Sequence, residues 1–232
     1  MKRFYKDVGV ERGAGGWEVR LDGRPVRSPA KAVLRLPGAA LAEAIAGEWA
    51  AQGEEIDPAT MPLLRLACTA IDRVAPRRAA VIDEIVAYGG SDLLCYRATE
   101  PVELIARQRD IWQPLLDWAA DRFGARLEVT AGVAPIDQPP SALAALRATL
   151  AERDDPTLVG LRALTAATGS LVIALAALDA EIDADALWRA AQLDEDWQIE
   201  RWGEDAEAAA RRAALRADID AALRFLSLVA AG

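Results

Sequence analysis

Three consecutive carboxylates, Asp194, Glu195 and Asp196, form the longest uninterrupted run of acids in the chain. Two carboxylates that flank a glycosidic bond can hydrolyse it, one as the acid and the other as the base or nucleophile. Acids adjacent in sequence on a helix point in different directions, because each residue turns the helix by about 100°. These side chains therefore cannot flank one bond, and a hydrolase is disfavoured.

Other groups suited to catalysis are scarce. The chain has no histidine, which removes the commonest general base near neutral pH, the Ser-His-Asp arrangement and most transition-metal sites. No cationic cluster flanks Cys68 or Cys95 closely enough to generate a thiolate, with Arg97 beyond Cys95 a weak exception, so we interpret both as ordinary buried thiols. Residues 13–16 are glycine-rich but lack the Lys-Ser/Thr of a phosphate loop. We therefore expect no catalytic residue, no metal and no organic cofactor.

The acids lie among aromatic residues. If residues 183–202 form one helix, the spacing of these residues decides which of them share a face. One face of that helix would then carry apolar residues toward the core: Ile182, Ala186, Ala190, Leu193 and Trp197. The opposite face would carry Trp188, Glu195, Ile199 and Trp202. A carboxylate is thus placed within an aromatic and aliphatic stripe, and a second apolar face needs a second partner.

Two explanations of this stripe remain open. Both faces can be covered within the chain, with Glu195 paired to an arginine such as Arg201 or Arg162. Alternatively, the stripe binds another protein, since aromatic anchors ringed by charge are typical of binding hot spots. In the second case Asp194 and Asp196, which flank Glu195, join the candidate binding residues.

The predicted secondary structure that positions these residues changes from strands to helices along the chain. Alternating apolar residues predict strands before residue 37, and Asp22-Gly23 is a strong hairpin signal. Helical spacing dominates afterwards, with one further possible strand over 126–133. Strands are expected over 4–10, 17–21, 24–26 and 33–36, and helices over 63–74, 77–88, 101–122, from 155 to about 178, and 204–230.

The pattern predicts an α+β fold, with a small N-terminal antiparallel sheet and its helices followed by a larger helical bundle. We place an N-terminal mixed α/β domain at 1–97 and a C-terminal helical domain at 98–232. In the helix expected from Asp155, leucines spaced three and four apart form a seam for packing against neighbouring helices. Those residues are Leu161, Leu164, Thr168, Leu171, Leu175 and Leu178.

Composition and charge narrow the class of partner. Hydrophobic residues make up 53% of the chain and charged residues 27%, as in a globular protein. The net charge of −9 argues against nucleic acid or an anionic membrane. Residues 1–36 carry nine Lys or Arg against four acids. We find no secretory signal in residues 1–10 and no apolar stretch suited to membrane insertion.

Several short motifs, in order along nearly the whole chain, resemble the assembly chaperones of the F-type ATP synthase α subunit. The motifs are Arg3 to Lys6, Gly16 to Arg24 followed by Ser28-Pro29, Glu48-Trp49, Thr60 to Leu63, Leu94 to Arg97, and 193–203. The resemblance implies a molecular chaperone that binds the unassembled α subunit and shields its subunit interface until the catalytic head assembles. It implies a cytoplasmic location for a bacterial member and the mitochondrial matrix for eukaryotic relatives.

The resemblance also marks Glu195 as important for chaperone activity, and it implies no enzymatic reaction and no small-molecule substrate. Relatives can have tyrosine where this chain has Trp197. We interpret the Glu48-Trp49 pair as structural, because Trp49 continues the face of Leu41 and Ile45. Two rival functions are a small-molecule enzyme that uses carboxylates and arginines, and a structural subunit of a complex.

Overall fold

The strands before residue 37 form a small antiparallel sheet, as the alternation predicts. In the computed structural model, which describes all 232 residues, β1 (Val8–Gly13) pairs along its length with β2 (Gly16–Leu21). Two short strands, β3 (Arg24–Pro25) and β4 (Arg35–Leu36), pair with the C-terminal and N-terminal ends of β2. The first strand begins at Val8 rather than at Phe4, and the rest of the expected order is confirmed.

Two tight turns hold this sheet in register. Asp22 and Gly23 adopt φ of 49° and 77°, the positive values that a type I′ hairpin turn requires. Gly16 has φ of 131°, and a Cβ there would lie 2.6 Å from the carbonyl oxygen of Leu36. Only glycine fits that position, because both the backbone angle and the close approach exclude a side chain.

By their contacts the residues divide into two compact units. We call residues 1–78, 154–160 and 221–232 the sheet unit, and residues 79–153 and 161–220 the helical unit. These bounds differ from the domains expected at 1–97 and 98–232, because the sheet unit includes segments from the second half of the sequence. Helices α6 (Asp155–Thr168) and α10 (Ala206–Ala230) each contribute residues to both units.

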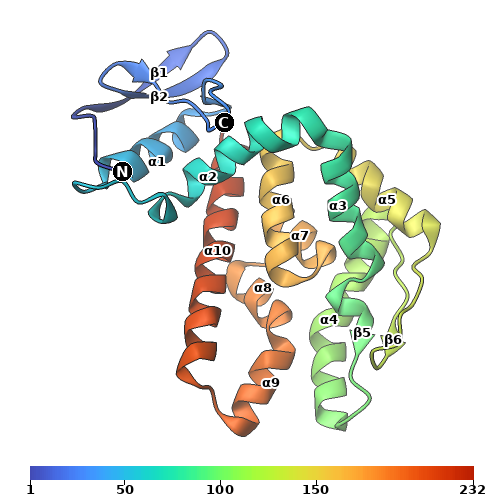
Figure 1. Cartoon of the computed structure of the whole chain (residues 1–232). Helices are drawn as coiled ribbons and strands as arrows, with labels where there is room; N and C mark the ends of the chain where they lie inside the picture. The colour runs from blue at the N-terminus through green and yellow to red at the C-terminus, as the bar shows by residue number, and fades with distance from the viewer. The chain divides into compact units, whose positions relative to one another are not determined.

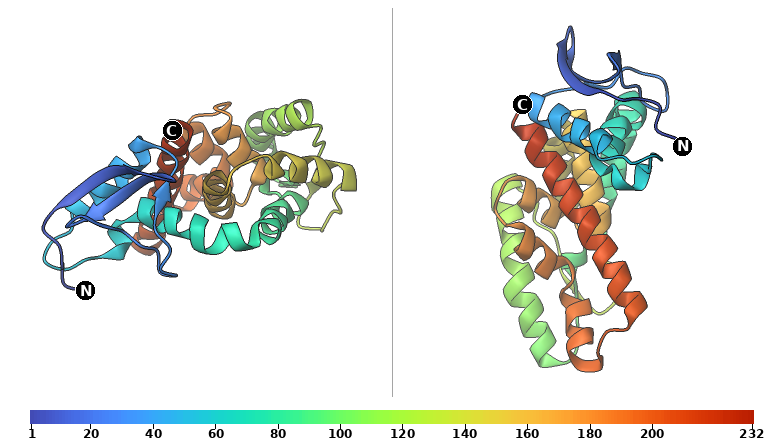
Figure 2. Two further views of the ribbon diagram at one scale, coloured as in Figure 1. Left: turned by 90° about the horizontal axis from the view of Figure 1, so that it is seen from above. Right: turned by 90° about the vertical axis from the view of Figure 1, so that its left-hand side faces the viewer.

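The core of the sheet unit lies where α1 (Ala39–Ala50) packs against β1 and β2 (Figures 1 and 2). Helix α1 buries Leu41, Ile45 and Trp49, which confirms the expected face. Next along the chain come the 3₁₀-helix η1 (Pro58–Thr60), α2 (Pro62–Thr69), the short π-helix η2 (Ala70–Val74) and the 3₁₀-helix η3 (Ala75–Arg77). Phe225, from the far end of the chain, is fully buried in the same core.

The helical unit is built almost wholly from helices. It includes α3 (Arg78–Gly90), η4 (Leu93–Cys95), α4 (Val102–Phe123), α5 (Pro140–Ala151), α7 (Leu171–Leu178), α8 (Ala184–Ala191) and α9 (Leu193–Trp202). The expected strand over 126–133 is reduced to β6 (Thr130–Ala131), which pairs in parallel with β5 (Tyr96–Arg97). Helix α4 contains Pro114 and ends at Phe123, close to the expected bounds of 101–122, with Gly124 as its C-cap.

The expectation of one helix from Asp155 to about Leu178 is wrong, because the chain turns at Gly169. That residue has φ of 70°, and the Ser170 hydroxyl then accepts a hydrogen bond from the Ile173 backbone N–H at 3.0 Å. This contact caps a new helix, α7, whose residues 171–176 are all buried. The expected seam is therefore divided between α6 and α7.

None of the helices combines the length and the apolar character that a crossing of a lipid bilayer would require.

Candidate functional site

The candidate stripe over 183–202 does not lie on one helix, contrary to the prediction. Gln192 leaves helical geometry at φ of −109° and ψ of 15°, so α8 ends at Ala191 and α9 begins at Leu193. Figure 1 shows α8 and α9 as two separate helices. Trp188 is therefore carried by α8, whereas Glu195, Ile199 and Trp202 are carried by α9.

Trp188 is occupied within the helical unit. Its ring is half-buried, and the guanidinium groups of Arg212 and Arg216 from α10 lie 5.3 and 5.5 Å from the ring centroid. Such cation–π contacts are attractive when a cation lies within about 6 Å of an aromatic face. Trp188 thus packs against α10 rather than extending the stripe that Glu195 belongs to.

The remaining three residues share one side of α9, at spacings of four and three, and we call Glu195, Ile199 and Trp202 the α9 face. Glu195 is half-exposed and Ile199 is half-buried. Trp202 is 77% exposed, the largest exposed aromatic surface in the chain. Large aromatic side chains are normally covered, so an open tryptophan ring is a candidate anchor for another protein.

Neither arginine suggested as an internal partner pairs with Glu195. Arg162 forms an ion pair with Glu84 at 3.2 Å. The guanidinium of Arg201 lies 3.9 Å from the ring centroid of Trp197. Glu195 makes no ion pair or side-chain hydrogen bond in the structure, so its charge is left open to a partner.

The neighbouring acids behave differently. Asp194 accepts a hydrogen bond from the amide Nε2 of Gln108 at 2.7 Å, and Asp196 pairs with Arg212 at 2.5 Å. Each of these two carboxylates therefore contributes to packing within the helical unit. Of the three consecutive acids, only Glu195 remains without an internal partner.

A cleft of about 480 Å³ lies beside the α9 face. Trp202 and Trp197 line it from α9, and Arg97 and Val133 line it from the β5 and β6 segments. Val133 is 95% exposed. The cleft therefore joins the exposed ring of Trp202 to a second exposed apolar side chain, and both are within the helical unit.

Buried polar groups shape the inner wall of this cleft. Gln108 is 1% exposed, and its Oε1 accepts a hydrogen bond from the Ala98 N–H at 2.8 Å. The carbonyl oxygen of Gln108 accepts a bond from Arg97 Nη1 at 2.8 Å. Burial lowers the pKa of the Arg97 guanidinium. This network fixes the start of α4 against β5 and, through Asp194, against α9.

Sequence reasoning gave no role at this site to Gln108, Arg97 or Val133. Gln108 was a usable signal, since an amide among Leu104, Ile111 and Leu115 on the buried face of α4 must find hydrogen-bond partners. Val133 has no such signal, because one valine in a loop looks the same whether it is exposed or buried.

Trp197 is 7% exposed and belongs to the core side of α9, as predicted. Besides Arg201, the guanidinium of Arg107 also lies over its ring, at 4.9 Å from the centroid. Arg107 in turn binds both carboxylate oxygens of Glu200, at 2.7 and 2.9 Å. These contacts hold α9 against α4 and so fix the orientation of the α9 face.

The two cysteines are not placed for chemistry. Burial raises the pKa of the Cys95 thiol to about 12 and that of the Cys68 thiol to about 11. Both side chains are therefore neutral thiols at physiological pH, and neither has the stabilised thiolate that a nucleophilic cysteine needs.

Comparison with known proteins gives a consistent result. Residues 2–120 match the family model described as ATP12 chaperone protein. Atp12 from Paracoccus denitrificans is 46% identical, with a TM-score of 0.93 and coverage of 98% of both chains. A mutant of P. denitrificans Atp12p is 45% identical, with the same TM-score, over 98% of this chain and 97% of that one.

A candidate chaperone from Agrobacterium tumefaciens is 46% identical, also with a TM-score of 0.93, and the match covers 98% of this chain and 86% of that protein. The likeness thus extends over nearly the full length of this chain, and it includes both the sheet and the segment that carries α9.

Proposed function

Because the chain belongs to the ATP12 chaperone family, we propose that it binds the unassembled α subunit of F-type ATP synthase and shields the interface that this subunit later buries. An assembly chaperone needs a protein partner and no turnover, so we propose that the chain is not an enzyme. We place this activity in the bacterial cytoplasm, where such a client would be synthesised.

We further propose that the α9 face contributes to the contact with the client. The single observation that carries this assignment is the pairing of an unpartnered carboxylate, Glu195, with the 77% exposed ring of Trp202 on the same side of one helix. An aromatic anchor buries much area at low conformational cost, and a nearby charge selects its partner by complementarity. The adjoining cleft, with exposed Val133, extends the apolar area.

Substitution of Glu195 tests this proposal, because a binding role and a folding role predict different results. Glu195→Gln is expected to change the free energy of unfolding by less than about 0.5 kcal/mol, since the carboxylate has no internal partner. Loss of one member of a desolvated interface ion pair costs about 2 to 5 kcal/mol of binding. The variant should therefore keep its melting temperature but no longer prevent aggregation of purified α subunit.

Glu181→Gln is the matched control, because Glu181 is also an exposed acid of the helical unit without an ion pair. It should protect the α subunit as well as the parent protein does. If Glu195→Gln melts early while its folded fraction still protects the α subunit, then Glu195 acts in folding and the α9 assignment is wrong.

Co-purification from cells distinguishes the rival functions. Recovery of the α subunit without the completed enzyme supports the chaperone. Stoichiometric retention in the assembled ATP synthase would instead indicate a structural subunit. Turnover of a small anionic substrate by the purified protein would indicate the enzyme.

A further inference from the structure

Two tryptophans of the helical unit, Trp188 and Trp197, share an arrangement in which arginine side chains lie over the indole ring. The guanidinium groups are 3.9 to 5.5 Å from the ring centroids. A cation within about 6 Å of an indole face is attracted by the ring, and the planar guanidinium can also stack on it. Each ring is thus already occupied by cations of this chain. They belong to Arg107 and Arg201 at Trp197, and to Arg212 and Arg216 at Trp188.

Carboxylates hold these arginines in place. Arg107 binds both carboxylate oxygens of Glu200, at 2.7 and 2.9 Å, while its guanidinium lies over Trp197. Arg216, which lies over the other ring, pairs with Asp185 at 3.0 Å. A guanidinium makes both contacts at once, because its flat face meets the ring and its N–H groups point outward in the same plane. An arginine site in this unit therefore combines an aromatic face with a carboxylate.

The α9 face has both of these parts but no arginine. Trp202 is 77% exposed, and the cation–π contacts of the helical unit involve other rings. The spacing of seven residues places Glu195 and Trp202 on the same side of α9, about 10 Å apart along its axis. The long tryptophan side chain leans back toward the preceding turn and narrows this gap. One guanidinium between them can therefore stack on the ring and donate to the carboxylate, with Ile199 as an apolar floor for the arginine methylenes.

The charge around the α9 face favours a cation. Trp202 is the last residue of α9, and the C-terminal end of a helix carries partial negative charge. The helical unit has 13 arginines, no lysine, and 24 aspartates and glutamates. The arginine next to Trp202 in sequence, Arg201, is engaged over Trp197. The negative charge of Glu195 therefore has no compensating group within the chain and is complementary to a cation of a partner.

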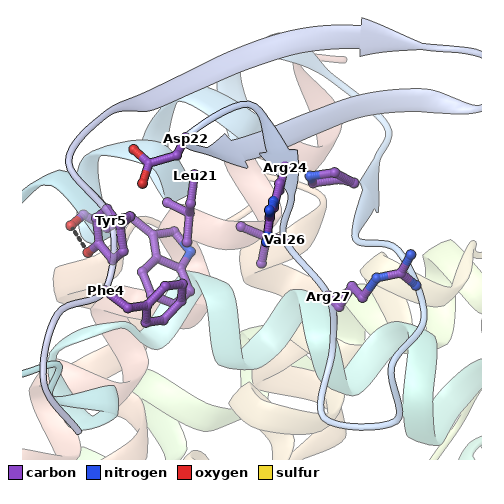
Figure 3. A pocket seen from close by; sticks show the side chains of 9 residues that line it. Phe4, Tyr5, Leu21, Asp22, Arg24, Val26 and Arg27 are labelled. Carbon is purple, nitrogen blue, oxygen red and sulfur yellow. Dashed lines mark hydrogen bonds between the residues drawn. The ribbon is translucent and has the colours of Figure 1, made fainter.

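The other strongly exposed aromatic ring, Phe4 of the sheet unit, lacks this combination. Figure 3 shows Phe4 next to Tyr5, in the same pocket as Arg24. The rings of Phe4 and Tyr5 meet edge to face, with centroids 5.4 Å apart. The carboxylate of that pocket, Asp22, accepts two backbone N–H groups. An exposed aromatic ring beside a carboxylate without a partner is therefore found on α9 and not at Phe4.

We propose that the α9 face is a binding site for one arginine side chain of the partner polypeptide. The guanidinium stacks on Trp202 and donates to the carboxylate of Glu195, and the methylenes of the arginine lie on Ile199. The inference deepens the proposed function, on which it rests for the identity of the partner, by naming the side chain that the α9 face recognises. Lysine fits this site less well, because an ammonium group has no flat face to stack and no two parallel donors.

A blocked tripeptide, acetyl-Gly-Arg-Gly-amide, tests the site without the α subunit. Added to the full-length protein, it is expected to shift the indole N–H resonance of Trp202, which is assigned by its disappearance in Trp202→Phe. The corresponding lysine peptide carries the same charge and should bind about twofold or more weakly. Glu195→Gln should weaken binding of the arginine peptide about threefold. Glu181→Gln, the matched change at an exposed acid outside α9, should alter it by less than about 1.5-fold, by long-range charge alone.

Two variants of Trp202 separate an arginine contact from a purely apolar one. Leucine keeps an apolar side chain but has no aromatic face, whereas phenylalanine keeps a face with a weaker attraction for cations. Trp202→Leu is expected to weaken binding of purified α subunit about tenfold, and Trp202→Phe about threefold. Both variants should keep the melting temperature of the parent protein, because the ring is 77% exposed. Isothermal titration of the α subunit provides the measurement.

The proposal is overturned if the arginine peptide leaves the Trp202 resonance unshifted, or if the lysine peptide binds as tightly as the arginine peptide. It is also overturned if Trp202→Leu binds the α subunit as tightly as Trp202→Phe. Normal protection of the α subunit by the parent protein would, in these cases, leave the proposed function standing. Conversely, a shift of Trp202 by the arginine peptide in a protein that fails to protect the α subunit would refute the proposed function and leave the arginine site standing.

Discussion

Glu195 and Asp92 are both carboxylates of the helical unit, and their surroundings give them opposite properties. Glu195 is half-exposed and has no internal partner. Asp92 is fully buried, and its two carboxylate oxygens accept backbone N–H groups from Leu94 and Val172, each at 3.1 Å. The first residue is free to bind another molecule, whereas the second joins η4 to the start of α7.

The buried position of Asp92 predicts a pH-dependent stability. Burial raises its pKa to about 6, although hydrogen bonds oppose that shift. The folded state therefore holds the proton more tightly than the unfolded chain, whose aspartates titrate near 3.9. The stability contributed by the proton is complete below about pH 4 and is lost as pH rises through about 6. Between pH 5 and pH 7 the loss is roughly 1 kcal/mol.

Urea unfolding of the parent protein and of Asp92→Asn at pH 5, 6 and 7 measures this contribution. The parent should lose stability relative to the variant as pH rises, because the asparagine does not titrate. A difference in unfolding free energy that stays constant over this range would show that Asp92 does not titrate there.

At the scale of the element, Glu48 illustrates how a side chain of one helix fixes the start of another. Its two carboxylate oxygens accept the backbone N–H groups of Leu63 and Leu64, at 2.8 and 2.9 Å. These groups lie in the first turn of α2, where backbone donors have no partner within the helix. Glu48 is therefore structural, in agreement with the interpretation from sequence.

Loss of this cap should destabilise the sheet unit. Glu48→Ala is expected to lower the free energy of unfolding by about 1 to 2 kcal/mol, as for the removal of other helix caps. Glu43→Ala, an exposed acid on the same helix, should change it by less than about 0.5 kcal/mol. Chemical denaturation of both variants provides the measurement. Equal effects would mean that the two hydrogen bonds contribute nothing to stability.

The ends of helices and strands could be predicted where a residue such as glycine marks the end of the element. Asp22-Gly23 correctly located a hairpin. Gly169 carried a signal for the break between α6 and α7, but the strong leucine spacing on both sides outweighed it. Gln192 carried none, since residues 183–202 contain neither glycine nor proline. The break there is a property of tertiary packing, which periodicity cannot reveal.

The candidate site could be predicted only in part. Spacing correctly grouped Glu195, Ile199 and Trp202, because they remain within one helix. It wrongly added Trp188, because the break at Gln192 intervenes. The cleft residues come from three segments distant in sequence, so their proximity depends on the tertiary fold.

At the scale of the whole molecule, the sheet unit is assembled from distant parts of the sequence. Phe225 is fully buried among residues of the sheet and of α1, such as Leu34 and Leu41. The N-terminal segment therefore depends on the last residues of the chain for part of its core. The contact-based units include this dependence, and a division at residue 97 does not.

A fragment of residues 1–97 is accordingly expected to be poorly folded, with little dispersion in its amide proton spectrum. In the full chain, Phe225→Ala should lower the free energy of unfolding by about 3 to 5 kcal/mol, because it leaves a cavity in the core. Phe4→Ala is the control, since Phe4 is 64% exposed, and it should cost less than about 1 kcal/mol. A well-dispersed spectrum from the fragment would instead support a domain boundary at 97.

Strand β1 pairs with β2 on one side only, so its other edge has unpaired backbone groups. The open side of a border strand is a template on which a further extended chain can add, and repeated addition leads to fibrils. Strand β1 carries the exposed charged residues Glu11 and Arg12, and Gly9 precedes them. Charged side chains on an edge strand oppose the pairing of another chain. Strand β1 is thereby a poor template for the addition of further chains.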